Sequence, residues 1–343
     1  MTFGHAGQAK HEIFSAKAGY PPGGAAANLG YDRRVMRTVF FGTPAIALPA
    51  LRALAETTEL LAVVCQPDRP AGRGLETTAP PVKQLALELG IEVHQPVKVK
   101  TGNLDAWLGE RHADVAVVLA YGRILPPAVL AAPRRGCMNL HASLLPRYRG
   151  AAPINWAIIA GETKTGVSLM QMDEGMDTGP VYAMRELEIG PDETAGELAE
   201  RIAELCARVV REDLRPAVDG ELALHPQNHA AASLAPLITK EHTRIDWQRP
   251  AREIANRVRG LAPRPGAHTV VGGKHLRVTR ARVAREAVSA PPGGVVLGIG
   301  REILVGTGSG TLEILRAQLE GKRELAARDL LNGRSIREGD TLG

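Results

Sequence analysis

Short, almost wholly apolar runs alternate with amphipathic segments along the chain from Arg37 onward. The apolar runs read RTVFF, ELLAVVCQ and ADVAVVLAY, and the segments between them, ALPALRALAE and PVKQLALELG, have the spacing of helices. Strands that are buried on both faces carry few polar residues, and helices must then cover both faces of their sheet. The pattern therefore predicts an α/β domain with a parallel-rich sheet between helical layers.

The same domain continues with two more strand-like runs and one long helix. TGVSLMQMD and GPVYAMRELEI are expected to be strands, and TAGELAERIAELCARVVREDL is expected to be a helix. Leu198, Ile202, Leu205 and Val209 recur on one face of that helix and should point into the core. We expect this first domain to span residues 36–220.

Three segments flank or follow that domain. Residues 1–35 have little periodicity and contain PPGGAAA, which predicts a flexible N-terminal extension. Residues 221–240 are weakly periodic and hold two prolines, as is typical of a linker. Residues 241–343 contain short, glycine-punctuated runs such as HTVVGGKHLRVTRARV, which predict a small C-terminal β-barrel.

Composition is that of a globular protein without a membrane anchor. The chain has 343 residues, of which 44% are hydrophobic, and no uncharged apolar run approaches the roughly 20 residues that cross a bilayer. The N-terminus lacks the charged and apolar regions of a signal peptide, so a cytoplasmic location is expected. Cys65, Cys137 and Cys206 lack paired spacing, which predicts neither a disulfide framework nor a metal site.

Positive charge is concentrated in the C-terminal third. Residues 240–343 hold 19 Lys and Arg against 11 Asp and Glu, whereas the preceding part holds 23 against 26. The whole chain has a net charge of +5. A basic region of this kind indicates a polyanionic partner, although many basic surfaces are only solvated.

Asn139 and His141 are two polar residues in a run that otherwise reads as a buried strand, GCMNLHASLLP. Residues i and i+2 of a strand point to the same side, so the two side chains should act together. Near the carboxyl edge of a parallel sheet, an amide beside an imidazole can stabilise a carbonyl oxygen that becomes negative. The alternative is that both are structural groups satisfied within the strand's own hydrogen-bond network.

Asp177 lies in MDEGMDTGP, where glycines allow the backbone to bend back toward the sheet edge. A carboxylate there could orient His141 and accept a proton from an attacking nucleophile. Asp173 and Glu174 lie nearby and compete for that role. An aspartate in a glycine-rich turn also commonly caps backbone amides, so this alternative stays open.

The segment CQPDRPAGRG carries Arg69 and Arg73 among prolines and glycines and is expected to be an irregular loop. Its arginines are suited to contacts with phosphates, although a solvated surface loop would look the same. FGTP lacks the glycine pattern of a dinucleotide site, and no P-loop, HExxH, GxSxG or clustered metal-ligand set is present.

Taken together, several segments resemble the methionyl-tRNA formyltransferase family. They occur in matching order and spacing between Arg37 and the C-terminus: FGTP, QPDRPAGRG, PVKQLA, AYGRILP, NLHASLLPRYRGAAPINWAI, TGVSLMQMDEGMDTGP and RIDW. The Asn-x-His, SLLP and Asp set is shared by the wider group of formyltetrahydrofolate-using enzymes. It is therefore specific for formyl transfer and not for the acceptor.

The resemblance implies a Rossmann-like catalytic domain, a linker and an oligonucleotide-binding-like barrel. It implies a reaction in which the formyl group of 10-formyltetrahydrofolate moves to the α-amino group of methionyl initiator tRNA. The partners would be that tRNA and the folate donor, with no metal and no membrane, and the protein would be a monomer.

The resemblance also implies roles for individual residues. Asn139, His141 and Asp177 fall on the family's catalytic positions. The folate-binding positions are Ser143, Leu144, Leu145 and Pro146 of the SLLP segment, with Tyr121 and Gly122 of AYGRILP. Arg73 matches an arginine of an inserted loop that reaches the tRNA, whereas Arg123, Arg147 and Arg149 receive no definite role.

Other functions remain possible at this point. A glycinamide ribonucleotide or amino-sugar formyltransferase, or a formyltetrahydrofolate hydrolase, would share the catalytic set but would not need the arginine-bearing segment or the basic C-terminal region. A nucleic-acid-binding protein on a decayed enzyme fold would show disruption of Asn139, His141 or Asp177, and none is visible.

Overall fold

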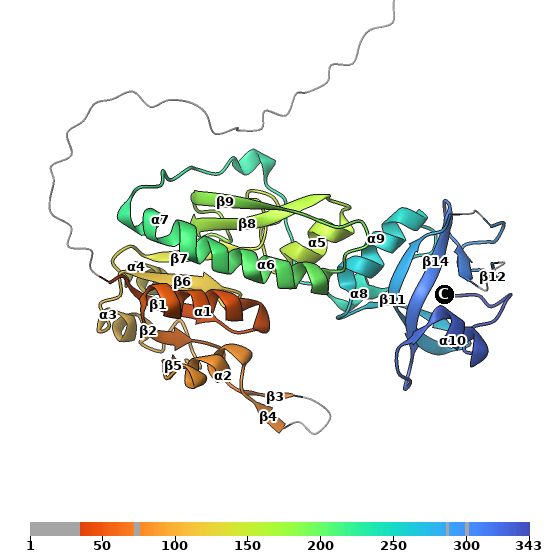
Figure 1. The fold of residues 1–343 in the computed structure, drawn as a ribbon, viewed down its shortest axis with the longest axis horizontal. Coiled ribbons are helices and arrows are strands. Elements are labelled where there is room, and N and C mark those ends of the chain that lie inside the picture. The colour runs from red at the N-terminus through yellow and green to blue at the C-terminus, as the bar shows by residue number, and fades with distance from the viewer. Residues whose placement is uncertain (1–34, 72–75, 286–287, 299–301) are drawn as a thin grey trace, which may run out of the picture. The chain divides into compact units, whose positions relative to one another are not determined.

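A seven-stranded sheet forms the centre of the N-terminal part of the fold. The computed structural model describes residues 35–71, 76–285, 288–298 and 302–343. The strands are β1 (Arg37–Gly42), β2 (Glu59–Val64), β5 (Glu92–His94), β6 (Val115–Leu119), β7 (Cys137–His141), β8 (Lys164–Gln171) and β9 (Val181–Glu188). Their order is β5-β2-β1-β6-β7-β8-β9; the first five strands pair in parallel, and β8 pairs antiparallel with both β7 and β9 (Figure 1).

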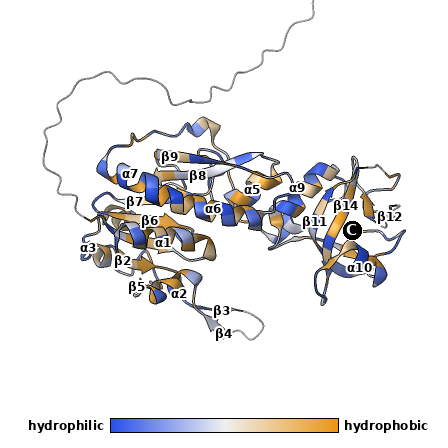
Figure 2. Ribbon diagram, viewed as in Figure 1, coloured by the Kyte–Doolittle hydropathy of each residue, from blue (hydrophilic) through white to orange (hydrophobic). Residues whose placement is uncertain are grey.

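Helices cover both faces of this sheet. Phe40 and Met138 point to one face, where they share a core with α1 (Leu48–Thr57), α2 (Pro81–Glu88), α5 (Pro153–Ile159) and α6 (Ala195–Val209). Phe41 and Cys137 point to the other, with α3 (Leu104–Gly109) and α4 (Pro127–Ala131). Figure 2 shows β6 in the hydrophobic colour, whereas α6 carries hydrophilic and hydrophobic residues. The predicted α/β domain is confirmed.

The C-terminal part is an antiparallel sheet packed on two helices. Its strands are β10 (Ala267–Val271), β11 (Lys274–Val283), β12 (Val295–Leu297), β13 (Ile303–Gly306), β14 (Thr311–Leu319) and β15 (Leu325–Ala326). They follow the order β10-β11-β14-β13-β12, with β15 beside β14. α9 (Ala251–Leu261) and α10 (Ala327–Asn332) contribute apolar residues to the core of this sheet.

Two local features connect the strands of this sheet. Gly272 and Gly273 both have positive φ, at 54° and 73°, and form the two-residue turn between β10 and β11. The backbone of Gly343 exchanges hydrogen bonds with Val270 of β10, at 2.9 and 3.1 Å, while Leu342 donates to Gly293 beside β12 at 2.8 Å. The last residues thus bridge the two outer strands, as the predicted barrel requires.

The segment between the two sheets contains short helices and irregular chain. After α6 the chain continues through a π-helical turn (Val210–Leu214), α7 (Arg215–Asp219), the 3₁₀ turn η3 (His229–Ala231) and α8 (Lys240–Thr243). The predicted linker, residues 221–240, lies here and makes backbone pairs with the first domain. The predicted N-terminal extension lies, apart from Val35, outside the described residues.

None of the helices in the described part of the chain is long and apolar enough to cross a membrane.

A capping box starts α6, the longest helix. The Thr194 hydroxyl accepts from the Glu197 N–H at 3.3 Å, and the Glu197 carboxylate accepts from the Thr194 N–H at 2.9 Å. Without these two hydrogen bonds, the backbone N–H groups of Thr194 and Glu197 at the start of the helix would lack these partners. The hydrogen bond from the Thr194 backbone holds the pKa of Glu197 below its ordinary value.

Thr194→Ala should lower the free energy of unfolding by about 1 kcal/mol at pH 7, because one helix amide loses its acceptor. A carboxyl with a depressed pKa stabilises the fold above its ordinary value, near 4.5, and this contribution is lost as pH falls through the lowered value. Glu197→Gln should remove that part of the pH dependence. Urea unfolding between pH 7 and pH 3 measures both effects, with Glu200→Gln on the same helix as control; equal curves for wild type and Thr194→Ala would contradict the cap.

Candidate active site

A pocket of about 750 Å³ opens where β6 and β7 end. These strands are parallel neighbours, so their carboxyl ends meet at one edge of the sheet, where folds of this class bind ligands. Asn139 and His141 line the pocket together with Asp177, and Tyr121 and Gly122 form part of its wall. The volume is within the range of small-molecule sites.

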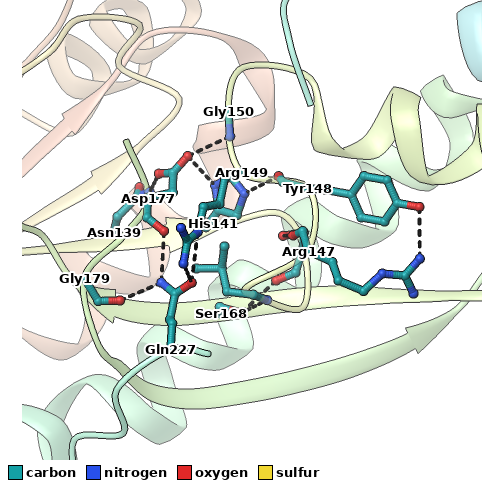
Figure 3. A network of polar contacts seen from close by, with 12 residues as sticks. Asn139, His141, Arg147, Tyr148, Arg149, Gly150, Ser168, Asp177, Gly179 and Gln227 are labelled. Carbon is teal, nitrogen blue, oxygen red and sulfur yellow. Dashed lines mark hydrogen bonds and ion pairs between the residues drawn. The ribbon is translucent and has the colours of Figure 1, made fainter. Parts of the chain in front are cut away.

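The three predicted catalytic side chains meet in this pocket (Figure 3). The Asn139 Nδ2 donates to Asp177 Oδ1 at 3.3 Å. The His141 Nδ1 lies 3.6 Å from Asp177 Oδ2, which is an ion-pair distance and too long for a direct hydrogen bond. The Gly150 N–H donates to the same Oδ2 at 2.8 Å and fixes the carboxylate.

Asp177 is brought to the strand pair by an unusual backbone conformation. Its φ is +55°, in the left-handed region, which aspartate tolerates better than most residues. The competing Asp173 instead accepts from the Gly175 N–H at 3.1 Å and the Thr178 hydroxyl at 2.7 Å, so it stabilises the turn. Among the interactions of the described residues, Asp177 is the only acidic residue of this loop that contacts Asn139 and His141.

The hydrogen bonds of His141 define where its protons lie. Its Nε2 is 2.9 Å from the Tyr148 carbonyl oxygen, and a carbonyl can only accept, so Nε2 carries a proton. His141 is 5% exposed. A second proton, on Nδ1, would face Asp177 and the pocket. The ring can therefore offer a donor to a bound substrate only from Nδ1.

The structure places the predicted folate-binding residues in two different settings. Tyr121 and Gly122 line the pocket, and burial raises the pKa of the Tyr121 hydroxyl to about 12. The residues Ser143, Leu144, Leu145 and Pro146 are absent from the described pocket lining. The Ser143 hydroxyl donates to the Arg147 carbonyl at 2.6 Å, and Leu145 packs in a small core cluster. This segment supports the loop that carries Tyr148 and Gly150.

The arginine-bearing segment is not wholly irregular, and that expectation is wrong for part of it. Arg69–Ala71 forms a short strand, β3, which pairs with β4 (Glu76–Thr78). A two-stranded ribbon has two open edges, so Pro70 is tolerated although it lacks an N–H. Arg69 is exposed and donates to Gln66 Oε1 at 3.3 Å. Arg73 lies outside the described residues.

The three arginines without assigned roles hold loops in place. Arg123 donates to the Gln66 side chain at 3.0 Å and to the Val97 carbonyl at 2.8 Å. Arg147 is paired with Glu162 on the surface. Arg149 is 6% exposed, and its guanidinium donates to Gln227 Oε1 at 3.1 and 2.6 Å.

Several residues at the site were not predicted from the sequence. They are Tyr148 and Gly150, which act through backbone groups, and Gln227, whose amide donates to the Asp177 carbonyl at 2.9 Å. Backbone groups leave no signature in residue type, and Gln227 lies in a weakly periodic segment, so no sequence signal identifies them. The described residues contain no cluster of His, Cys, Asp and Glu suited to a metal ion.

Comparison with known proteins identifies the family. The profile of the family described as "Formyl transferase" matches residues 36–213, and "Formyl transferase, C-terminal domain" matches residues 237–335. The methionyl-tRNA formyltransferase of Sorangium cellulosum is 61% identical over 310 residues, covering 90% of this chain and 100% of that protein. The Myxococcus xanthus protein of the same name is 50% identical over 88% of this chain and 96% of its own length.

Solved structures with 16–21% identity show a similar fold. The sugar 3N-formyl transferase WlaRD matches with a TM-score of 0.63 over 84% of this chain and 99% of its own. The methionyl-tRNA formyltransferase from Clostridium thermocellum gives a TM-score of 0.51 over 75% of this chain and 97% of its own.

HypX from Aquifex aeolicus, solved with tetrahydrofolic acid, has a TM-score of 0.59 and 21% identity over 88% of this chain; the match covers 48% of HypX, so this chain spans about half its length. These structural similarities show a shared fold. The family matches and the sequence identity over nearly the whole described chain show that the chain is homologous to the family. With its two matching domains in order and its polar triad at the sheet edge, the chain belongs to the formyltransferase family, among the methionyl-tRNA formyltransferases.

Proposed function

We propose that this protein transfers the formyl group of 10-formyltetrahydrofolate to the α-amino group of methionyl initiator tRNA. The product is N-formylmethionyl-tRNA for translation initiation. The observation that carries this function is the convergence of Asn139, His141 and Asp177 in one pocket of a chain 61% identical to a methionyl-tRNA formyltransferase. Tyr121 and Gly122 contact the folate, and Ser143–Pro146 support the wall behind it.

The reaction replaces one carbon–nitrogen bond with another. The neutral amine attacks the formyl carbon, its oxygen becomes negative, and the bond to folate N10 then breaks. Asn139 Nδ2 and His141 Nδ1–H supply the donors to that oxygen. Asp177 accepts the proton that the amine loses, directly or through water, and that proton is returned to N10.

The geometry supports these roles in two respects. At 3.6 Å from Asp177 Oδ2, His141 Nδ1 makes no direct hydrogen bond to that carboxylate, so a proton on Nδ1 is available to a substrate oxygen. Asn139 has two amide protons and uses one on Asp177. Tyr148 and Gly150 hold the imidazole and the carboxylate, so little reorganisation is needed when charge develops.

An acceptor assay tests the function directly. Methionyl initiator tRNA, glycinamide ribonucleotide, a nucleotide amino sugar and water are offered in parallel with 10-formyltetrahydrofolate, and formylated product and tetrahydrofolate are measured. We expect formylation of the tRNA at a kcat/KM at least about 100-fold above that of any other acceptor, a factor worth about 2.7 kcal/mol. Preferential formylation of a small acceptor would overturn the assignment.

Asn139→Ala and His141→Ala should each lower kcat by about 100- to 1000-fold, because each removes one donor to the developing oxyanion. The dissociation constant for tRNA should stay within about twofold in a filter-binding assay, since neither side chain belongs to the arginine-bearing segment. Activity near that of the wild type in either variant would exclude the proposed role.

We propose that Arg69, Arg73 and the basic C-terminal domain contact tRNA phosphates. Arg69→Ala and Arg73→Ala should each raise the KM for tRNA and reduce the slope of log affinity against log salt by about 0.7 to 0.9 per lost contact. Lys274→Glu tests the C-terminal sheet, where Lys274 is exposed. Arg211→Ala, which removes an exposed arginine paired with Glu56, is the control; an unchanged slope in all test variants would remove the support for RNA binding.

We also propose that residues 36–220, 221–240 and 241–343 act as catalytic domain, linker and tRNA-binding domain, and that the protein is a cytoplasmic monomer. The two family matches, at 36–213 and 237–335, support these boundaries. Light scattering and cell fractionation check the last two points.

A further inference from the structure

Residues 225–235, which we call the strap, connect the two loops that carry the catalytic groups. At one end, His225 and Val181 exchange two backbone hydrogen bonds of 2.9 Å each, just after the Asp177 loop. At the other, the Arg149 N–H donates to the Ser233 carbonyl at 2.9 Å, and the Ala235 N–H donates to the Arg149 carbonyl at 2.7 Å. The strap thus lies within the segment expected to be a linker, yet it contacts both loops.

The approach of the strap to the second loop is close. Gly150 has a φ of +122°, and a Cβ at this position would come within 2.7 Å of the Ala235 carbonyl oxygen. Only glycine fits here, because any side chain would force the strap away. The same Gly150 donates its N–H to Asp177, so the position of the strap bears on the catalytic carboxylate.

Gln227 is the residue of the strap that reaches the Asp177 loop (Figure 3). It is 8% exposed. Its Nε2 donates to the backbone carbonyls of Asp177 at 2.9 Å and Gly179 at 2.6 Å, while its Oε1 accepts two hydrogen bonds from Arg149. A guanidinium can only donate and a carbonyl can only accept, so the partners themselves determine which way the amide faces.

These bonds stabilise a backbone conformation on which the site depends. Asp177 is a non-glycine residue with a φ of +55°, a conformation that persists where its surroundings hold it. Gln227 binds the carbonyls on both sides of Thr178 and so holds this turn closed. If the turn relaxed, the carboxylate would move away from Asn139 and His141.

The pairing of Gln227 with a buried arginine needs an explanation. Arg149 has no carboxylate partner among the ion pairs of the described residues, and its side-chain hydrogen bonds there are to Gln227 and, at 3.2 Å, to His229 Nδ1. A glutamate at position 227 would neutralise this buried cation, which an amide cannot do. The same glutamate could not donate to the two carbonyls. The amide of Gln227 therefore meets the need of the Asp177 turn for two donors, rather than the need of Arg149 for a negative charge.

We propose that Gln227 is a positioning residue for formyl transfer, which holds the Asp177 carboxylate against Asn139 and His141 through the backbone of its turn, with Arg149 orienting the Gln227 amide. The assignment rests on the proposed function of the triad. Gln227 does not touch the reacting atoms, so its removal should affect the chemical step more than substrate binding.

Gln227→Glu tests this role with almost no change of shape. It keeps an acceptor for Arg149 and removes both donors to the Asp177 turn. We expect kcat to fall by about 10- to 100-fold, since a displacement near 1 Å of a catalytic group can cost that much. The KM values for folate and tRNA should stay within about twofold. The introduced carboxylate faces Arg149 and His229 and adds a negative charge near Asp177 and His141. The pH below which kcat falls, which we call the acid limb of the pH profile, should therefore move to a higher value.

A second variant removes the hydrogen bonds between Arg149, Gln227 and the Asp177 turn without leaving a buried charge. The double substitution Arg149→Met with Gln227→Met replaces both side chains by apolar groups of similar length, so that no unpaired guanidinium stays buried, while the carbonyls of Asp177 and Gly179 lose their donor. It should show the same loss of kcat without the shift of the acid limb. Circular dichroism and thermal melting confirm that each variant is folded.

Gln171→Glu is the matched control. The Gln171 Nε2 also donates to two backbone carbonyls, those of Cys137 at 3.1 Å and Arg135 at 3.3 Å, and its Oε1 accepts from the Tyr182 hydroxyl at 3.0 Å. These bonds lie at the opposite end of β7 from His141. We expect Gln171→Glu to lose stability but to keep kcat within about twofold and the acid limb unchanged.

The outcomes separate the two proposals. An active wild type whose folded Gln227 variants keep full kcat would overturn the positioning role and leave the formyl transfer intact. An equal loss of kcat in Gln171→Glu would also overturn the positioning role, because the loss in the Gln227 variants would then reflect only a general disturbance of the structure. A wild type that formylates no acceptor would overturn the proposed function and, with it, the role of Gln227.

Discussion

Of the polar pair at the end of β7, His141 is buried and Asn139 is partly buried, and the loops around them give both groups partners. An imidazole and an amide away from water cost free energy unless they are hydrogen-bonded. Tyr148 supplies the carbonyl for His141, and Asp177 supplies the carboxylate for Asn139. The remaining donors, the second amide proton of Asn139 and Nδ1–H of His141, are left for a substrate oxygen in the pocket to accept. Structural satisfaction and catalysis are therefore not alternatives at this site, because the same contacts serve both.

The loop that runs from Tyr148 to Gly150 connects the elements of the site. In three successive residues it provides the acceptor for His141, the guanidinium that binds Gln227 and the N–H that binds Asp177. The SLLP segment before it is anchored by Ser143 and Ser168, whose hydroxyls bond to backbone groups in the interior. These hydrogen bonds restrict the motion of the turn, and a restricted turn holds the catalytic groups in position.

Some features followed directly from residue pattern. Wholly apolar runs predicted β1 and β6 as interior strands, and period-two spacing predicted that Asn139 and His141 act on the same side. The short, glycine-punctuated runs after residue 240 predicted the strands of the C-terminal sheet, and the structure shows Gly272 and Gly273 in the turn between two of them. The family resemblance added the reaction and the acceptor, which periodicity alone could not supply.

Other features depended on contacts between segments far apart in the chain. Asp177 was the predicted carboxylate, with Asp173 and Glu174 as competitors from the residues alone, and the structure shows that a left-handed turn brings Asp177 to the pair, held by an amide 50 residues further along. Arg149 received no definite role from the sequence, and the structure shows it buried and bonded to Gln227 of the strap. The sequence by itself determined the layers, the strand pair and the chemistry available at its end, because those depend on local spacing. The tertiary structure decided how the Asp177 carboxylate meets the pair and what holds it there, because backbone groups and long-range hydrogen bonds carry no signature in the order of residues.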